Sequence, residues 1–228
     1  MTNMTEMTLS ELIERFRRVE TAAISDAMEP KVSAMNGEIK SVIGETKIAG
    51  PALTVRCYPG DELTMERAID VAKQGDVIVV DGRGSKLAAF FGGIGFGYCW
   101  QKGVEGAVID GSTRDTEEIK DYGFPVFARS TTPASAVSAS MGQISVPIQC
   151  GGVLVNPGDI IVGDTDGVVV VPSIEAEKIL LIAEKISSLD DETISWIKAK
   201  VPIVEIERRR MEKSPEIIEL KKKLLGRT

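Results

Sequence analysis

Histidine is absent from this chain of 228 residues. Its absence removes the most common general base and metal ligand, and it excludes Ser-His and Cys-His dyads. Only three cysteines are present, Cys57, Cys99 and Cys150, and their wide spacing and odd number indicate neither a disulfide framework nor a CxxC metal site. We expect them to be buried structural thiols. Any chemistry must therefore use carboxylates, Arg, Lys, Tyr, Cys or a bound metal.

Long apolar runs are also lacking, since none approaches the roughly 18 to 20 residues that cross a bilayer. The N-terminal residues do not show the charged-then-apolar pattern of a signal peptide. We therefore expect a cytoplasmic protein with no membrane partner. The formal net charge of -7 gives no overall attraction for a phosphate backbone, so we expect no direct nucleic-acid partner.

The first part of the chain alternates amphipathic helices with short apolar runs that are typical of buried strands. This alternation favours a layered α/β fold over separate α and β domains. Thr8 or Ser10 is suited to cap the first helix. The expected elements are one helix or two short ones over 8–28, a strand at 53–57, a helix over 63–75, a strand over 76–82, a helix over 86–103, a strand over 105–111, a helix over 114–123 and a strand over 124–130.

The second part predicts strands separated by Gly, Pro and Asp turns, followed by helices from Ser173 to Thr228. We predict an α/β, β-rich sandwich domain over 1–172 and a C-terminal helical extension over 173–228. The last charged segment is too polar to bury alone, so it either extends along a neighbouring subunit or frays into solvent. The expected strands lie within 134–140, 144–155, 158–164 and 167–172.

The strongest candidate for chemistry is the strand-to-helix junction GAVIDGSTRDTEEI. Its apolar run delivers Asp110 to the carboxyl end of a strand, where ligands bind in open α/β sheets. Arg114 then suits a carboxylate and Asp115 a hard cation such as Mg²⁺. The alternative is structural, with Asp115 in the first helical turn and Arg114 in a surface ion pair.

The glycine cluster FFGGIGFGYCW is the second candidate, because each glycine costs roughly 1 kcal/mol inside a helix. Exposed N–H groups near a helix start bind anions, and glycines permit close approach of a carboxylate or phosphate. Tight helix packing is the alternative explanation. Arg129 and the segment 130–133 are given a supporting role in the same pocket. Most aspartates in Gly-Asp or Asp-Gly pairs are expected to be turn residues: Asp76, Asp81, Asp159, Asp164 and Asp166.

These motifs, in this order, carry a resemblance to a known family. AGPALTV, GDVIVVDG, GVEGAVIDGSTRD, GFPVFARSTTP and NPGDIIVGDTDGVVVVP span roughly residues 20 to 172. The chain resembles the family that unites regulator of ribonuclease activity A with the 4-hydroxy-4-methyl-2-oxoglutarate aldolases, whose members are often mislabelled demethylmenaquinone methyltransferases. The resemblance implies a swivelling β/β/α sandwich that assembles as a homotrimer or hexamer.

The resemblance also implies a divalent-metal-dependent lyase, either an aldolase or an oxaloacetate decarboxylase, acting on a small 2-oxo acid. Arg114 would bind and polarise the substrate, and Asp115 would anchor Mg²⁺ or Mn²⁺. The glycine segment Gly92, Gly93, Ile94 and Gly95 would bind the substrate, with the amides of Ile94 and Gly95 holding the pyruvate carboxylate. The alternative is a non-catalytic regulatory binding protein like the ribonuclease regulator.

One position departs from the aldolase pattern. The aldolases place an acidic residue 21 positions before the arginine, and this chain has Gly93 there. In the aldolases that carboxylate organises metal-bound water. The aldolase also borrows a Glu from a neighbouring subunit's C-terminal region, a role for which Asp191 and Glu192 are candidates here.

Overall fold

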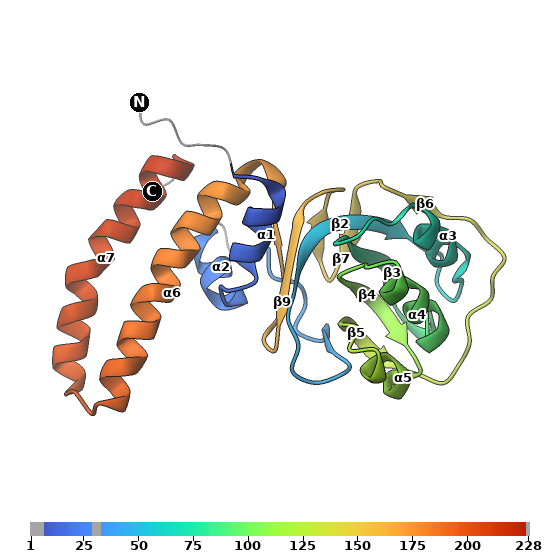
Figure 1. The fold of residues 1–228 in the computed structure, drawn as a ribbon, viewed down its shortest axis with the longest axis horizontal. Helices are drawn as coiled ribbons and strands as arrows, with labels where there is room; N and C mark the ends of the chain where they lie inside the picture. Colours follow the sequence, from blue (N-terminus) through green and yellow to red (C-terminus); the bar gives the residue numbers. More distant parts are fainter. Residues whose placement is uncertain (1–6, 29–32, 227–228) are drawn as a thin grey trace. The chain divides into compact units, whose positions relative to one another are not determined.

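The computed structural model describes residues 7–28 and 33–226. They form two compact units (Figure 1), a sheet unit of residues 33–173 and a helical unit of residues 7–28 and 174–226. The two N-terminal helices, which the sequence analysis assigned to the sandwich domain, therefore cluster with the C-terminal helices. The division into domains at residue 172 stays a prediction, and residues 1–6, 29–32 and 227–228 lie outside the described part of the chain.

The sheet unit is built on four parallel strands with antiparallel strands added at both sides. The strands are β1 Lys40–Ser41, β2 Ile48–Arg56, β3 Val77–Ala89, β4 Gly106–Thr113, β5 Val126–Thr131, β6 Gln143–Ile144, β7 Ile148–Cys150, β8 Val153–Val155, β9 Ile160–Asp164 and β10 Gly167–Val171. Their order in the sheet is β1-β5-β4-β3-β2-β9-β10, with the short β6 also paired to β2, while β7 and β8 form a separate hairpin. The α/β class and the β-rich sheet with C-terminal helices are confirmed.

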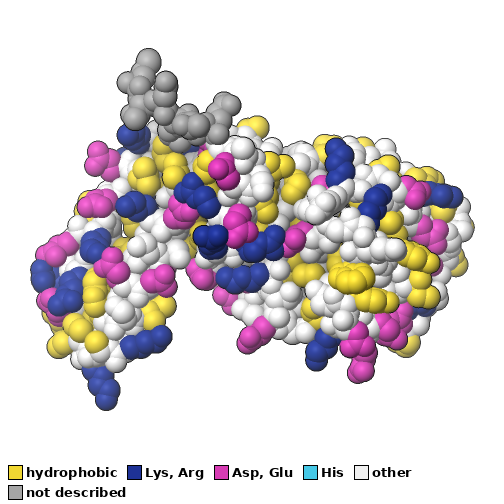
Figure 2. Space-filling model, in the orientation of Figure 1, with side chains coloured by type: hydrophobic (Ala, Val, Ile, Leu, Met, Phe, Trp, Pro, Cys, Tyr) yellow, Lys and Arg dark blue, Asp and Glu magenta, His cyan; other side chains and the backbone are white. Residues whose placement is uncertain are grey.

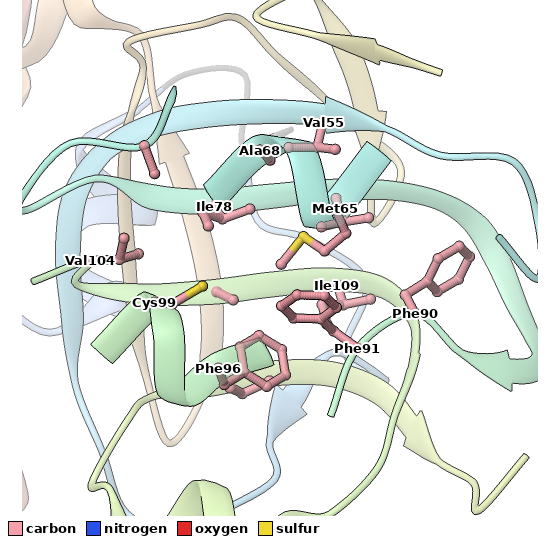
Figure 3. Packing of buried hydrophobic residues seen from close by; sticks show 14 of the residues in the cluster. Val55, Met65, Ala68, Ile78, Phe90, Phe91, Phe96, Cys99, Val104 and Ile109 are labelled. Carbon is pink, nitrogen blue, oxygen red and sulfur yellow. The ribbon is translucent and has the colours of Figure 1, made fainter. Parts of the chain in front are cut away.

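Each face of the parallel strands is covered by a different layer, which explains their continuous apolar sequences. Helices α3 (Leu63–Val71), α4 (Gly93–Gln101) and α5 (Thr116–Asp121) contribute to the core on one face. Met65 of α3 and Phe96 of α4 meet Ile109 of β4 there (Figure 3). On the other face, the β7–β8 hairpin packs against the alternate residues of the same strands. All eight residues of β4 are buried as a result.

Two expected elements were wrong. Residues 86–89 continue β3 as a strand, because the chain bulges and then pairs Ala89 with Ser112 of β4; helix α4 begins only at Gly93. Residues 134–140 form no ladder and make isolated bridges at Ser135 and Val137. This segment is held instead by the buried carboxylate of Asp61, which accepts hydrogen bonds from the backbone N–H groups of residues 139 and 140.

The helical unit contains two short helices and two long ones, so the opening segment forms two helices. Its helices are α1 Leu9–Phe16, α2 Thr21–Ala27, α6 Ala176–Lys198 and α7 Ile203–Leu225. Thr8 and Glu11 form a capping box at the start of α1. Helices α1, α2 and α7 each pack on α6, and the surface of α6 and α7 mixes both signs of charge (Figure 2).

In α7, Ile206 is the only buried side chain among the residues described, and ion pairs such as Arg209–Glu205 follow its surface. Its polar character agrees with the expectation that it does not form a core by itself. Within the described residues, no helix is long and apolar enough to cross a membrane.

Candidate functional site

A cavity of about 510 Å³ opens in the sheet unit between helices α3 and α4 and the end of β4. It brings together five of the residues selected from the sequence: Gly92, Ile94, Gly95, Arg114 and Asp115. The hydrophobic side chains of α4 gather at the surface of this region (Figure 2). The remaining lining residues are Glu62, Glu66, Ile69, Asp70, Phe91 and Tyr98.

Asp115 holds its carboxylate in the cavity through an unusual backbone conformation. It precedes the first residue of α5, but its side chain makes no capping hydrogen bond to that helix. Its φ of 57° places it in the left-handed region, which few residues other than glycine, asparagine and aspartate adopt. Oδ2 instead accepts a hydrogen bond of 3.0 Å from the N–H of Gly93, the first residue of α4. The hydrogen bond of this side chain therefore goes to the start of α4 and not to α5.

Arg114 is anchored by its backbone and remains loosely paired by its side chain. Its N–H donates to the carbonyl oxygen of Phe91 at 3.2 Å, which fixes the residue beside the start of α4. The guanidinium Nε lies 3.5 Å from Asp115 Oδ2, too long for a strong hydrogen bond. Because a guanidinium carries five donors, most of its hydrogen-bonding capacity is available to a ligand.

The glycines of the cluster permit the close approach of α4 to the Arg114–Asp115 pair. A Cβ atom on Gly92 would collide with Asp115 Oδ2 and lie 2.9 Å from Arg114 Cγ. A Cβ atom on Gly93 would lie 2.8 Å from Glu118 Cβ. The packing explanation is confirmed by these contacts, and the anion site stays a prediction. An acidic side chain at position 93 would require α5 to move.

The start of α4 offers further donors. An α-helix leaves its first N–H groups without acceptors inside the helix. The Gly93 N–H is used by Asp115, whereas those of Ile94 and Gly95 come next in the first turn, and both residues line the cavity. A carboxylate placed beside Arg114 would therefore meet a guanidinium and a helix N-terminus together.

Three carboxylates that line the cavity were not predicted from the sequence. Glu62, Glu66 and Asp70 border the cavity from α3 and the residue before it. Their spacing of four residues was a usable signal, because residues four apart lie on the same face of a helix. What the sequence did not reveal is that this face of α3 borders the same cavity as Arg114. Burial raises the pKa of Glu62, the Glu66 carboxylate raises it further, and Arg114 opposes both effects.

Arg129 does not line this cavity, and neither do residues 130–133. The Arg129 guanidinium pairs with the buried carboxylate of Asp110 and donates to Glu38 Oε2 at 2.7 Å. The supporting role proposed for this segment was therefore wrong, because the side chain of Arg129 is already occupied by two carboxylates.

The turn aspartates serve the local backbone as expected. Asp76 accepts from the N–H of Lys73, Asp81 from that of Arg83, and Asp159 from that of Asn156. Asp164 accepts from the N–H of Asp166. These four carboxylates therefore stabilise the turns in which they lie.

The donors in the cavity suit a hard cation better than a soft one. All three cysteines are buried, and burial raises the pKa of Cys57 and of Cys99 to about 12, so they stay protonated. Among the described residues, no group of three or more His, Cys, Asp or Glu side chains is arranged to enclose a metal. Mg²⁺ fits such a site, because it is commonly held by one or two carboxylates and keeps several waters. Asp115, predicted from the sequence to anchor the cation, is one of the carboxylates that line the cavity.

A family model described as RraA-like, Aldolase/RraA, matches residues 21–170. The chain belongs to this family. The resemblance noted from the sequence motifs is thereby confirmed, and the RraA-like match covers β2 to β9 together with the helices that border the cavity.

Relatives of the chain within the RraA-like family carry aldolase names. A protein of Halalkalibacterium halodurans, provisionally named a 4-hydroxy-4-methyl-2-oxoglutarate aldolase, is 40% identical over 182 residues, which cover 80% of this chain and 86% of the relative. The 4-hydroxy-4-methyl-2-oxoglutarate aldolase of Thermus thermophilus is 32% identical over 67% of this chain and 92% of its own length.

A solved structure connects the chain to the other branch of the family. RraAS2 of Streptomyces coelicolor, described as an unusual member of the RNase ES inhibitor RraA family, superimposes with a TM-score of 0.72 at 30% identity. The match covers 86% of this chain and 99% of RraAS2. The RraA-like fold is thus shared by proteins named for catalysis and for inhibition.

Proposed function

We propose that this chain is a divalent-metal-assisted lyase that cleaves a C–C bond of a small 2-oxo acid, by retro-aldol cleavage or by decarboxylation of oxaloacetate. The observation that carries the proposal is the Arg114–Asp115 pair, which lines a cavity and is bonded to the start of α4. The aldolase names of the relatives support the reaction class.

Arg114 and the first turn of α4 account for substrate binding. The carboxylate of a 2-oxo acid would accept hydrogen bonds from the guanidinium and from the N–H groups of Ile94 and Gly95. The same guanidinium would polarise the adjacent oxo group. In both reactions the electron pair of the broken C–C bond passes to the carbon next to the oxo group and onto the oxo oxygen, so positive charge fixed beside that oxygen favours bond cleavage.

Asp115 would bind the divalent cation. With Oδ2 bonded to the Gly93 N–H, its Oδ1 is left to hold Mg²⁺ or Mn²⁺. When bound, a divalent cation supplies Lewis-acid stabilisation of the negative charge that develops during cleavage. We also propose that the chain acts as a cytoplasmic homotrimer or hexamer.

The test is release of pyruvate from oxaloacetate and from 4-hydroxy-4-methyl-2-oxoglutarate, with Mg²⁺, with Mn²⁺ and with EDTA. We expect metal-dependent turnover and a loss of about 100- to 1,000-fold in kcat in Asp115→Ala, the range for removing one group that stabilises developing charge. Asp121→Ala, which removes an exposed carboxylate at the other end of α5, is the matched control. A protein-free sample with the same metal corrects for spontaneous decarboxylation.

Turnover that survives both EDTA and Asp115→Ala would refute the metal-assisted lyase. Absence of turnover in the assembled wild-type protein would favour the second candidate, a regulatory binding protein. The structural likeness to RraAS2 is the observation that supports this second candidate.

A further inference from the structure

A second cavity of the sheet unit, of about 410 Å³, opens at the carboxyl ends of β2 and β3, the edge where ligands bind in open α/β sheets. It shares no lining residue with the cavity of Arg114. Arg56 at the end of β2 and Arg83 in the bulge of β3 line it, and none of its described lining residues is acidic. In a chain with a net charge of -7, this local excess of positive charge indicates an anionic ligand. The other lining residues are Cys57, Tyr58, Met141, Gly142 and Gln143.

The guanidinium of Arg56 is held in place by the protein. Nη1 donates to Gln143 Oε1 at 2.6 Å, and Nη2 donates to the carbonyl oxygen of Pro147 at 2.5 Å. Nε lies 3.8 Å from Asp81 Oδ2, which is too far for a hydrogen bond. Because a guanidinium carries five donors, these two bonds fix its orientation and leave part of its capacity for a ligand.

Arg83 presents its guanidinium from a strained backbone. Its φ of 55° lies in the left-handed region, where the glycines on either side of it in the sequence would be at ease. Its N–H donates to Asp81 Oδ1 at 3.2 Å, but among the described residues its side chain has no ion pair and no hydrogen bond. The fold therefore gives no reason for arginine at this position, and strain of this kind is typical of functional positions.

The cavity is shaped before any ligand binds. The N–H of Gly142 donates to the buried Thr64 Oγ1 at 2.7 Å, and a Cβ atom on Gly142 would collide with the carbonyl oxygen of Arg56. This part of the lining is therefore packed tightly against the end of β2. Tyr58 and Met141 are each 50% exposed, so a hydroxyl group and apolar surface are also accessible there.

This set of donors suits a phosphate group better than a carboxylate. Arg83 offers its whole guanidinium, Arg56 offers part of its own, and both forks match the oxygens of a phosphate. A phosphate has three acceptor oxygens and up to two negative charges, whereas a carboxylate has two oxygens and one charge. The cavity is within the range of about 300–1,000 Å³ that is usual for small-molecule sites, so it has room for an organic group beside Tyr58 and Met141.

We propose that the second cavity binds the phosphate group of a small molecule, with Arg83 and Arg56 as its cationic ligands. This site is separate from the proposed lyase site and does not depend on it.

Calorimetric titration of the full chain in metal-free buffer tests the site, with inorganic phosphate and phenyl phosphate as probes and phenol as the phosphate-free control. We expect both phosphates to bind, phenol not to bind, and the affinities to fall at high salt because exposed charges are screened. Tighter binding of phenyl phosphate would assign the site to a phosphate ester that also contacts Tyr58 and Met141. Equal affinities would assign it to inorganic phosphate, and both results support a phosphate site.

The variant Arg83→Gln keeps an unbranched side chain and removes the guanidinium. It should weaken binding of both phosphates about 10- to 100-fold, the range for losing charge-assisted hydrogen bonds. Because the Arg83 side chain is exposed and unpaired among the described residues, the variant should fold normally. Arg67→Gln is the matched control, since it removes an exposed arginine of the sheet unit that does not line the second cavity.

Three results would overturn the proposal. The first is that neither phosphate binds the wild-type chain, and the second is that Arg83→Gln and Arg67→Gln weaken binding equally. The third is a loss of binding in Arg114→Gln but not in Arg83→Gln, which would place the phosphate in the other cavity. None of these measurements depends on pyruvate release, so failure of the phosphate site and failure of the lyase function are distinguishable.

Discussion

Two arginine–aspartate pairs lie near the end of β4, and they differ in almost every physical respect. Arg129 and Asp110 are nearly buried, with side-chain exposures of 12% and 8%, and they are in direct contact. Arg114 and Asp115 are exposed by 33% and 41% and lie 3.5 Å apart beside the cavity. Residue type alone does not distinguish a structural ion pair from a candidate site; burial and the remaining hydrogen-bonding capacity do.

The buried Arg129–Asp110 pair uses more of its hydrogen-bonding capacity than the exposed Arg114–Asp115 pair. Asp110 Oδ2 accepts a bond of 2.8 Å from the N–H of Gly151, and Arg129 also donates to Glu38. Asp115, in contrast, is held in a left-handed backbone conformation and uses one oxygen for Gly93. Strain that persists beside a cavity is typical of functional positions. The first pair is therefore part of the folded core, whereas the second keeps hydrogen-bonding capacity that the fold does not use.

The largest expected difference between the two pairs is in the stability lost when the aspartate is removed. Asp110→Ala should lower the free energy of unfolding by about 3–5 kcal/mol, because it leaves a nearly buried guanidinium and the Gly151 N–H without their acceptor. Asp115→Ala should lower it by only about 1–2 kcal/mol, the cost of alanine in a left-handed backbone conformation at an exposed position. Denaturant unfolding of the two variants measures both values. Equal losses of stability would contradict the division of roles.

A smaller effect comes from Gly92. Gly92→Ala places a methyl group where Asp115 Oδ2 lies, so it displaces the carboxylate from the cavity. We expect kcat/KM for pyruvate release to fall about 10- to 100-fold, because misplacement by about 1 Å is enough for such a loss. The stability should fall by about 1–3 kcal/mol, the usual cost of overpacking.

Gly37→Ala is the control for this change, since no atom lies within 4 Å of its added Cβ. It should leave both activity and stability close to wild type. If Gly92→Ala retained full activity, the close approach of α4 to Asp115 would have no part in function.

The smallest effect is a pH dependence of stability in the cavity wall. The pKa of Glu62 is raised in the folded state, so the folded protein binds more protons than the unfolded chain as the pH passes through the range above the ordinary carboxyl value of 4.5. Stability from this group is therefore greatest at low pH and declines as the pH rises through the raised pKa. Glu62→Gln should flatten this decline in metal-free protein, as measured by urea unfolding at several pH values. A steeper decline in the variant would contradict it.

The sequence predicted the parallel core well because its strands are continuous apolar runs with turn residues after them. It failed at 86–89, where helical composition was overridden by pairing of β3 with β4 across a bulge. It also failed at 134–140, where alternating small residues resemble a strand but the backbone bonds to the Asp61 carboxylate.

Only one side of the candidate site was predicted from the sequence. Arg114, Asp115 and the glycines stand in local motifs, and the structure brings them to one cavity. The acidic face of α3 was missed although its period is regular, because its significance depends on which helix packs beside α4. That information is tertiary, and the local sequence does not contain it.

The left-handed backbone at Asp115 has a consequence for how this position tolerates exchange. The backbone favours glycine, asparagine or aspartate, whereas holding a cation requires a carboxylate. Aspartate is the one residue that meets both demands, so even glutamate, with the same charge and one more methylene, is a poor replacement. A cation-holding role would therefore leave no alternative residue at position 115, whereas none of the other described residues that line the cavity is under this backbone constraint.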